Sequence, residues 1–360
     1  MPNSYARRAQ ELQKRLRRES LDALLITSPA DWYYLTGFTG EAGALIVSQR
    51  HLTLVTDGRF TVQAAQELRG VSVVEQKEGL YRSCGELLKN LPAGKVGFDP
   101  NQVTVAHCQL LKTAAGRATQ FKQIAGLVAS QRARKDPAEL AQMRKAALLA
   151  SEVVESAIAM LKPGVREFEI AAEIEYQMRQ RGASGAAFES IVAFGARAAL
   201  PHARPTAKRL RKNELVVLDL GAILGKYCSD ITRTVYVGKA PARIRLWYQA
   251  VQEAQAAAIG AIGPGKSGGE VDAAARGVLA AYQLDQYFVH STGHGLGLEV
   301  HEDPRLAKGQ KTQLALGNVV TIEPGVYIAG VGGIRIEDDI AVQQGRNEVL
   351  TRASRDFIEL

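Results

Sequence analysis

Two segments of the sequence repeat one pattern, and this repeat restricts the fold more than any other feature of the chain. Residues 213–237 contain Leu-Val-Val-Leu-Asp-Leu-Gly, a glycine-containing turn, and Ser-Asp-Ile-Thr-Arg-Thr-Val. Residues 318–342 contain Val-Val-Thr-Ile-Glu-Pro-Gly, a glycine-rich turn, and Gly-Ile-Arg-Ile-Glu-Asp-Asp-Ile. β-Branched runs separated by glycine turns are typical of strand–turn–strand hairpins. The chain is therefore predicted to contain two similar halves that face each other.

Each predicted hairpin carries acidic residues among apolar ones. Asp219 and Glu323 interrupt the first strands, and Asp230 and Glu337 lie on the returning strands. A carboxylate inside an apolar strand costs free energy unless it is paired or binds a metal. One such residue is compatible with a satisfied core carboxylate or a strand end. Four in matching positions favour metal ligation.

The segment between the hairpins adds three of the six histidines of the chain, His290, His294 and His301. A lone histidine is more often structural, but three within twelve residues beside four strand acids indicate a site. Four carboxylates and one imidazole suit two divalent cations. Oxygen-rich ligation favours Mn²⁺, with Co²⁺ or Zn²⁺ as alternatives. Two ions about 3.5–4 Å apart would lower the pKa of a bridging water and polarise a scissile carbonyl.

These motifs resemble those of the pita-bread metallopeptidases, which include methionine aminopeptidase, Xaa-Pro aminopeptidase and Xaa-Pro dipeptidase (prolidase). The resemblance covers nearly the whole chain. It implies a mixed α/β (α+β) fold, in which a creatinase-type N-terminal α/β domain precedes a pita-bread catalytic domain with a pseudo-twofold repeat. It implies that Asp230 and Glu337 bridge two metals, that Asp219 completes one ion, and that His294 and Glu323 complete the other.

The same resemblance implies roles for residues around the ligands. His202 would hydrogen-bond the substrate and the transition state, and His301 would contact the scissile carbonyl or the tetrahedral intermediate. Arg335 would pair with the metal-site carboxylates. Supporting roles would fall to His290, Thr232 and Tyr327. For His202 the alternative is an exposed loop histidine, and for Tyr327 it is ordinary packing.

Two further acids, Asp338 and Asp339, compete for the ligand role of Glu337. Alternation along a strand puts Arg335, Glu337 and Asp339 on one face and Asp338 on the other. The resemblance selects Glu337, and Asp338 and Asp339 are interpreted as residues of the exit strand.

Substrate class follows from the same resemblance. The long N-terminal domain and the wording of the motifs indicate the proline-specific members, and the length resembles short bacterial Xaa-Pro aminopeptidases. The prediction is a dinuclear-metal aminopeptidase that releases the first residue of Xaa-Pro peptides, with Phe188, Phe194 and Tyr327 as candidates for the proline subsite. The alternative is an Xaa-Pro dipeptidase, in which Arg305 would read the proline carboxylate rather than being an exposed loop arginine. A metal-free binding module is a distant alternative, disfavoured because all five ligands are present.

The first part of the chain alternates short strands with helical patterns, which indicates a small sheet covered by helices. The expected strands are Ala23–Thr27, Ala44–Ser48, Leu52–Thr56, Val71–Val74 and Lys95–Phe98. The expected helices are Thr61–Leu68, Cys84–Leu91 and an amphipathic helix around Tyr5–Leu16. A polar, charged stretch near residue 131 predicts domains at residues 1–127 and 128–360. After it, Asp136 is predicted to cap a long helix over Ala138–Leu161.

Composition excludes several classes. The net charge of +8 raises the question of nucleic acid, but the basic residues of positions 7–18 fit the solvated face of the first helix better. No secretion signal or membrane span is visible. Three cysteines without a disulfide-like spacing predict a reducing cytoplasm. The resemblance implies a homodimer.

Overall fold

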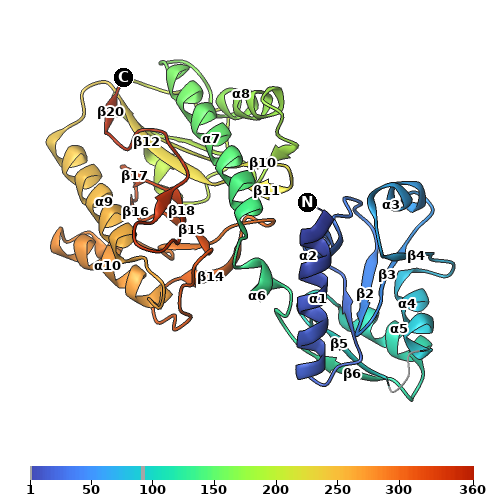
Figure 1. Ribbon diagram of the computed structural model, residues 1–360. Helices are drawn as coiled ribbons and strands as arrows, with labels where there is room; N and C mark the ends of the chain where they lie inside the picture. Colours follow the sequence, from blue (N-terminus) through green and yellow to red (C-terminus); the bar gives the residue numbers. More distant parts are fainter. Residues whose placement is uncertain (1, 91–93) are drawn as a thin grey trace. The chain divides into compact units, whose positions relative to one another are not determined.

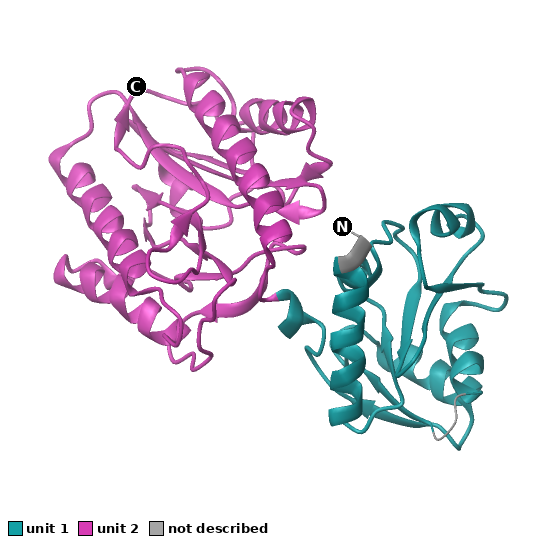
Figure 2. Cartoon of the chain, viewed as in Figure 1, with its two compact units in different colours: residues 1–132 teal, residues 133–360 magenta. Residues whose placement is uncertain are grey.

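The computed structural model describes residues 2–90 and 94–360. The chain divides into two compact units, residues 1–132 and 133–360 (Figure 2). The boundary predicted between residues 127 and 128 lies just ahead of the short helix α6 (Ala129–Arg132). Among the described residues, no helix is both long and apolar enough to cross a membrane.

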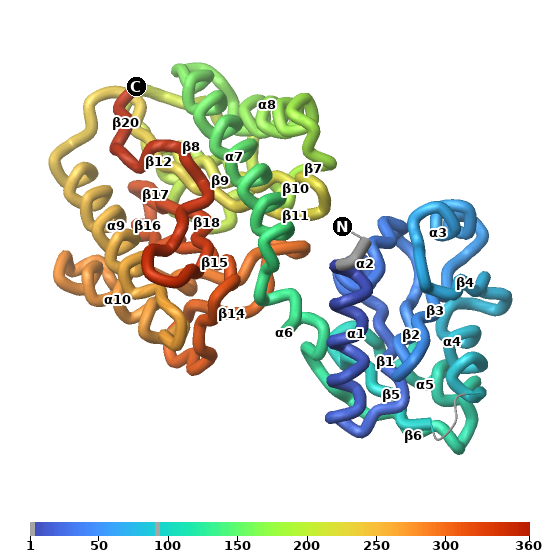
Figure 3. Tube along the Cα trace, in the orientation of Figure 1, coloured from blue at the N-terminus to red at the C-terminus, as the bar shows by residue number. Residues whose placement is uncertain are grey.

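The N-terminal unit is one mixed sheet with helices. Its strands run in the order β4-β3-β2-β1-β5-β6, and Figure 3 lets the chain be followed through them. β1 pairs with β2 antiparallel and with β5 parallel. The strands are β1 (Ala23–Ile26), β2 (Ala44–Ser48), β3 (Leu52–Thr56), β4 (Ser72–Glu75), β5 (Lys95–Phe98) and β6 (Gln120–Gln123). The helices before α6 are α1 (Pro2–Arg18), α2 (Pro29–Thr36), α3 (Thr61–Glu67), α4 (Leu80–Lys89) and α5 (Val105–Ala115).

All five strands expected in this unit are present, and β4 is shifted by one residue. The sequence analysis missed β6, α2 and α5. The helix expected from Cys84 begins earlier, at Leu80, and the end expected at Leu91 lies outside the described residues.

Helix α1 has the amphipathic character predicted for it, with one exception. Leu12 and Leu16 are fully buried. Arg8 was expected on the solvated face but is buried, with its guanidinium carbon 4.3 Å from the ring centroid of Tyr34. The expectation was wrong at this position because the aliphatic stem of an arginine buries readily when an aromatic ring receives its charge.

The C-terminal unit has two halves, and in each a pair of helices precedes six strands, with the 3₁₀ helix in a different place. The first half contains α7 (Pro137–Ala159), α8 (Glu167–Gln180), β7 (Gly185–Ala186), β8 (Ile191–Phe194), the 3₁₀ helix η1 (Gly195–Ala199), β9 (Glu214–Leu220), β10 (Ala222–Leu224), β11 (Tyr227–Cys228) and β12 (Ile231–Val237). The second half contains α9 (Ala242–Ala261), α10 (Gly268–Ala281), η2 (Asp285–Tyr287), β13 (Gly293–Gly295), β14 (Glu302–Leu306), β15 (Val319–Ile322), β16 (Gly325–Ile328), β17 (Gly332–Arg335) and β18 (Asp338–Ala341). Two short strands follow, β19 (Glu348–Val349) and β20 (Ile358–Glu359).

Each half has its own core between a helix pair and a set of strands. One cluster joins α7 and α8 to β8, β9 and β12, and the other joins α9 and α10 to the strands of the second half. In Figure 1 the two helix pairs flank the strands of the unit. The start of α7 is as predicted: the Asp136 side chain accepts from the amides of Ala138 and Glu139, and Glu139 completes the capping box.

The two predicted hairpins are present, and each consists of two nested strand pairs. β9 pairs antiparallel with β12, and the shorter pair β10–β11 lies between them in sequence. β15 pairs with β18 in the same way around β16–β17. The second acid of each hairpin was expected on the returning strand. Asp230 and Glu337 instead occupy the residue just before β12 and β18, where the chain re-enters the outer pair.

Candidate metal centre

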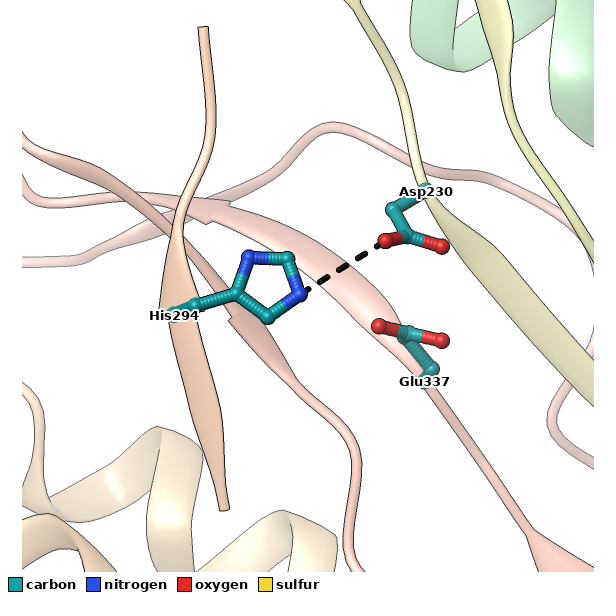
Figure 4. Close-up of side chains that lie close together, drawn as sticks. All are labelled: Asp230, His294 and Glu337. Carbon is teal, nitrogen blue, oxygen red and sulfur yellow. Dashed lines mark ion pairs between the residues drawn. The ribbon is translucent and has the colours of Figure 1, made fainter. Parts of the chain in front are cut away.

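Three side chains from the two halves converge on one point of the C-terminal unit. Asp230, His294 and Glu337 each offer a ligand atom, and these atoms lie within 4.8 Å of one another. All three residues are buried, and their side chains point toward each other in Figure 4. Two carboxylates and an imidazole at this spacing have the composition of a divalent-cation site.

The backbone around His294 explains how the imidazole reaches the acids. A Cβ atom on Gly293 would lie 1.9 Å from the carbonyl oxygen of Thr321, so only glycine allows this approach between β13 and β15. His294 Nδ1 lies 3.0 Å from the carbonyl oxygen of Gly295, which makes it the protonated nitrogen. Its Nε2 lone pair therefore faces Glu323 Oε1 at 3.5 Å and Asp230 Oδ2 at 3.7 Å.

Burial and mutual repulsion perturb the acids of this centre. Burial raises the pKa of the Asp230 carboxyl well above its usual value, and the charges of Glu337 and Asp219 raise it further. Burial also raises the pKa of Glu337 well above its usual value, with Glu323 adding to the effect. Burial raises the pKa of Glu323 to about 7 and lowers that of His294 to about 4. A group of carboxylates this hard to ionise together is an electrostatic complement to bound cations.

Unsatisfied oxygens give an independent test of that fit. Asp219 Oδ1 and Asp230 Oδ1 are buried and have no hydrogen-bond partner among the described residues. Buried carboxylate oxygens are almost always satisfied, so these two positions fit a ligand of positive charge. Hard oxygen donors with one imidazole fit Mn²⁺ or a similar divalent ion.

Asp219 is not part of the three-residue cluster, and Arg335 connects it to the centre. Arg335 Nη2 donates to Asp219 Oδ2, and Arg335 Nε donates to Thr232 Oγ1 at 3.0 Å. Thr232 Oγ1 in turn donates to Glu337 Oε2 at 2.6 Å. Arg335 therefore pairs with Asp219, a predicted metal ligand, across to strand β9 of the other half.

Arg335 also organises a second group beside the centre. Its Nη1 donates to the Tyr327 hydroxyl at 2.6 Å and to the Pro201 carbonyl at 3.3 Å. The Tyr327 oxygen lies 2.8 Å from His290 Nε2, and His290 Nδ1 lies 2.8 Å from the Ser291 carbonyl. Because Arg335 can only donate, the Tyr327 hydroxyl donates to His290, which is then the neutral Nδ1–H tautomer. Burial and the charge of Arg335 lower the pKa of His290 to about 4, in agreement with a neutral ring.

The remaining predicted residues lie at the exposed side of the centre. The ring of His301 lies 4.3 Å from that of His294, centroid to centroid. Burial lowers the pKa of the His301 imidazole, and neighbouring positive charge lowers it further. His202, His301 and Arg305 are exposed. Phe194 was expected to line a proline subsite, but it is fully buried in the core of the first half, and that expectation was wrong.

Asp338 and Asp339 both lie on β18, as the exit-strand interpretation required. Asp339 Oδ2 accepts from the backbone amide of Asp230 at 3.1 Å. Asp338 is fully buried and its oxygens accept from four side chains: Arg233, Gln255, Thr351 and Arg355. Sequence reasoning missed this network. A usable signal was Arg233, a cation in the middle of an otherwise uncharged strand.

Repeated hairpins bring buried acids and a histidine together at a candidate metal site, as in metal-dependent hydrolases. Residues 141–344 match the metallopeptidase family M24, and residues 8–134 match the creatinase/prolidase N-terminal domain. The chain belongs to metallopeptidase family M24. The predicted family and the mixed α/β fold with a creatinase-type first domain are confirmed.

Similar proteins extend over the whole chain. It is 35% identical over 351 residues to an Xaa-Pro dipeptidase of Pyrococcus furiosus, which covers 98% of this chain and 99% of that protein. The solved structure of an Xaa-Pro dipeptidase from Bacillus anthracis has a TM-score of 0.95 at 36% identity, covering 99% of this chain and 100% of that one. An X-Pro aminopeptidase from Thermotoga maritima has a TM-score of 0.88 at 33% identity, covering 96% and 100%. The predicted preference for aminopeptidase over dipeptidase activity is therefore not confirmed.

Proposed function

We propose that the chain is an Xaa-Pro dipeptidase that hydrolyses the bond before a C-terminal proline. The observation that carries the proposal is full-length similarity to Xaa-Pro dipeptidases, at 35% and 36% identity, combined with an exposed arginine on the strand next to that of His294. An Xaa-Pro dipeptide presents a carboxylate directly after the proline ring, and burying that charge without a cation is costly. Arg305 is the candidate cation, because it is exposed on β14, the strand that pairs with the His294 strand β13.

The ligand set proposed for two divalent ions is Asp219, Asp230, His294, Glu323 and Glu337. Two ions bound there would lower the pKa of a water molecule and polarise the scissile carbonyl. Asp219 and Asp230 each supply a buried oxygen without another partner. Thr232 holds Glu337 through a 2.6 Å hydrogen bond and so fixes the direction of its second oxygen.

The exposed histidines act on the substrate in this proposal. His301 has a lowered pKa and is neutral near pH 7, so one ring N–H can donate to the oxygen that develops negative charge. His202 is exposed in the segment that follows η1, which suits it to hold the same peptide group. Arg335, Tyr327 and His290 form a hydrogen-bonded chain that is already satisfied, and their role is to keep Asp219 and the loop at Pro201 in position.

A second candidate function is the removal of the first residue from longer Xaa-Pro peptides. It is favoured by the similarity to the Thermotoga maritima X-Pro aminopeptidase. The two candidates differ in whether residues beyond proline are accepted.

The test compares kcat/KM for Ala-Pro and Ala-Pro-Ala with the purified protein in Mn²⁺, Co²⁺ and Zn²⁺. A dipeptidase hydrolyses Ala-Pro with the higher kcat/KM, and chelation abolishes the activity. A higher kcat/KM for the tripeptide would make the enzyme an aminopeptidase. Leu-Ala serves as the control substrate, because it lacks the tertiary amide of an Xaa-Pro bond.

A further inference from the structure

One fully buried carboxylate in the first half holds both ends of the loop that carries His202. Glu167 is the first residue of α8 and is 0% exposed. Its Oε1 accepts from the backbone amide of Phe194 at 2.9 Å, and its Oε2 accepts from the amide and hydroxyl of Thr206 at 2.9 and 2.6 Å. Arg197 Nε donates to both oxygens. The first and last residues of the segment from Phe194 to Thr206 are thereby hydrogen-bonded to the same side chain, that of Glu167.

A second buried carboxylate, in the other half, holds a histidine-bearing segment at one residue, Thr292. Asp272 on α10 is 1% exposed. Its Oδ1 accepts from the amide and hydroxyl of Thr292 at 3.3 and 2.8 Å, and its Oδ2 accepts from Arg276 Nε at 2.8 Å. Thr292 lies between His290 and His294 in the sequence.

The two arrangements share three kinds of donor, and Glu167 has one more, the amide of Phe194. In each, a carboxylate on the second helix of its half accepts an arginine Nε and both the N–H and the hydroxyl of one threonine. In each, the arginine also donates to carbonyls of the histidine-bearing segment. Arg197 Nη2 reaches the Arg204 carbonyl at 2.6 Å, and Arg276 Nη2 reaches the His290 carbonyl at 2.6 Å.

We propose that Glu167 and Asp272 are positioning residues, each for a different histidine of the site. Glu167 fixes His202 for its contact with the substrate, and Asp272 fixes His294 at the metal centre. The proposal rests on the proposed dipeptidase function for the role of His202. The role of Asp272, which fixes the predicted metal ligand His294, does not depend on the dipeptidase function.

The physical reason is that an exposed histidine can keep its position only if the backbone that carries it is held rigidly. His202 is exposed and no core packing holds its side chain, so the backbone on either side must fix its place. A displacement of about 1 Å in a substrate-contacting group can cost about 100-fold in rate. A buried carboxylate that accepts charged and neutral donors from two ends of a loop is a rigid way to prevent that displacement, because each lost acceptor leaves a buried donor unpaired.

Because the two residues position different histidines, their variants should change different quantities. In Glu167→Gln, kcat/KM for Ala-Pro should fall about 10- to 100-fold while Mn²⁺ affinity stays within about twofold of wild type. Amide hydrogen exchange over residues 195–206 should become faster. In Asp272→Asn, Mn²⁺ affinity should weaken about 10- to 100-fold, as for other residues that orient a metal ligand, while exchange over residues 195–206 stays unchanged. Isothermal titration with Mn²⁺ and hydrogen-exchange mass spectrometry need no substrate.

Matched controls separate positioning from plain stability. Glu139 is another buried carboxylate near a helix start, and it accepts from the Tyr227 hydroxyl and the Asp136 amide, neither of which lies in a histidine-bearing loop. Glu139→Gln should lower the melting temperature and leave kcat/KM and Mn²⁺ affinity unchanged. If Glu167→Gln or Asp272→Asn does not fold, the pairs Thr206→Val with Thr206→Ser and Thr292→Val with Thr292→Ser replace them. Serine keeps the hydroxyl and should rescue the effect of valine.

Three results would overturn the proposal. The first two are a folded Glu167→Gln with wild-type kcat/KM and wild-type hydrogen exchange, and a folded Asp272→Asn with wild-type Mn²⁺ affinity. The third is a Glu139→Gln variant that loses as much kcat/KM as Glu167→Gln and as much Mn²⁺ affinity as Asp272→Asn. If wild type hydrolyses neither Ala-Pro nor Ala-Pro-Ala, the proposed function fails. The positioning roles of Glu167 and Asp272 are then tested by amide hydrogen exchange and Mn²⁺ affinity alone.

Discussion

The hydroxyl of Thr232 donates to Glu337 Oε2 at 2.6 Å and thereby joins the two halves of the C-terminal unit at the candidate metal centre. Thr232 lies on β12 of the first half, and Glu337 precedes β18 of the second. The same hydroxyl oxygen accepts from Arg335 Nε at 3.0 Å. Thr232 therefore transmits the position of Arg335 to one of the two acids proposed to bridge the metals.

Replacing Thr232 by valine tests this connection. Valine has the same shape, but it leaves both Glu337 Oε2 and Arg335 Nε without this partner in a fully buried place. Mn²⁺ affinity should fall about 10-fold or more, as expected when a ligand loses its orienting hydrogen bond. Titration calorimetry measures it, and Thr232→Ser should keep wild-type affinity. Equal affinities in the valine and serine variants would refute the orienting role.

Arg305 is predicted to decide between dipeptide and tripeptide. A charge-assisted hydrogen bond to the proline carboxylate is worth about 1.5–3 kcal/mol. That corresponds to about 10- to 150-fold in kcat/KM. Arg305→Ala should lose this factor on Ala-Pro and change little on Ala-Pro-Ala, whose carboxylate lies one residue further away. Arg204→Ala, another exposed arginine of the C-terminal unit, is the control. A uniform loss on both peptides would point to a general effect and not to carboxylate recognition.

His202 and His301 are predicted to act on substrate without holding metal. Each alanine variant should lower kcat by about 10²–10³, the cost of losing one donor to the developing charge. Metal content, measured by elemental analysis after dialysis, should remain that of wild type. His51→Ala removes an exposed histidine of the N-terminal unit, which supplies none of the predicted ligands, and controls for surface changes. Loss of metal from His202→Ala or His301→Ala would assign that residue to the ligand set instead.

The stability of the metal-free protein should fall as pH rises above 6.5. Burial raises the folded-state pKa of Glu323 to about 7, so its stabilising effect is complete below its unfolded pKa near 4.5 and is lost as pH rises through 7. Asp230 and Glu337 are shifted in the same direction. The lowered pKa values of His290 and His294, about 4, act oppositely, but only between about pH 4 and 6.5.

Calorimetric melting in a chelator at pH 6.5 and pH 8 measures this effect. The melting temperature should be lower at pH 8, and added Mn²⁺ should raise it more at pH 8 than at pH 6.5, because ligands bind metal in the ionised form. Glu323→Gln should reduce the fall. A metal-free protein that is equally stable at both pH values would contradict the raised pKa of these carboxylates.

How far the sequence predicts this molecule depends on whether a feature is local. The strands of the first unit and the cap at Asp136 follow from alternation and capping chemistry, which act over a few residues. β6 was missed because Gln120–Gln123 is polar and mostly exposed, and its place depends on parallel pairing with β5. The anchors at Glu167 and Asp272 were missed for a related reason. Glu167 meets Thr206, and Asp272 meets Thr292, only after the chain has folded back, so no spacing reveals the contact.

Among the candidate site residues, the sequence identified the acids because a charge in an apolar strand is conspicuous. It assigned Phe194 to a subsite because an aromatic residue in a loop motif resembles a lining residue. Phe194 is instead the last residue of β8, and it packs into the core while its backbone amide bonds to Glu167. Burial of this kind is set by the direction of one side chain on a strand, and one-residue differences in register reverse it.

Asp338 is predicted to contribute strongly to the stability of the C-terminal unit, as the buried counterion of Arg233. It accepts from Arg233 and Thr351 at one oxygen and from Gln255 and Arg355 at the other, at 2.6–2.8 Å. Arg233 also donates to the carbonyls of Thr232 and Glu337 at 2.9 and 2.6 Å. Asp338 therefore neutralises the buried guanidinium that ties the two returning strands together.

Asp338→Asn should lower the free energy of unfolding of the C-terminal unit by about 3–5 kcal/mol, because Arg233 keeps its charge and loses its buried counterion. Arg355 is partly exposed, so Arg355→Gln, which removes only the outer partner of Asp338, should cost about 1 kcal/mol or less. The chain has two tryptophans, Trp32 and Trp247, and a Trp32→Phe background leaves Trp247 on α9 as the reporter of this unit. Urea unfolding followed by Trp247 fluorescence, in a chelator to remove metal linkage, gives both values. If Asp338→Asn costs no more than Arg355→Gln, the charge of Arg233 is balanced by its four carbonyl acceptors, and Asp338 is not the residue that holds the two strands together.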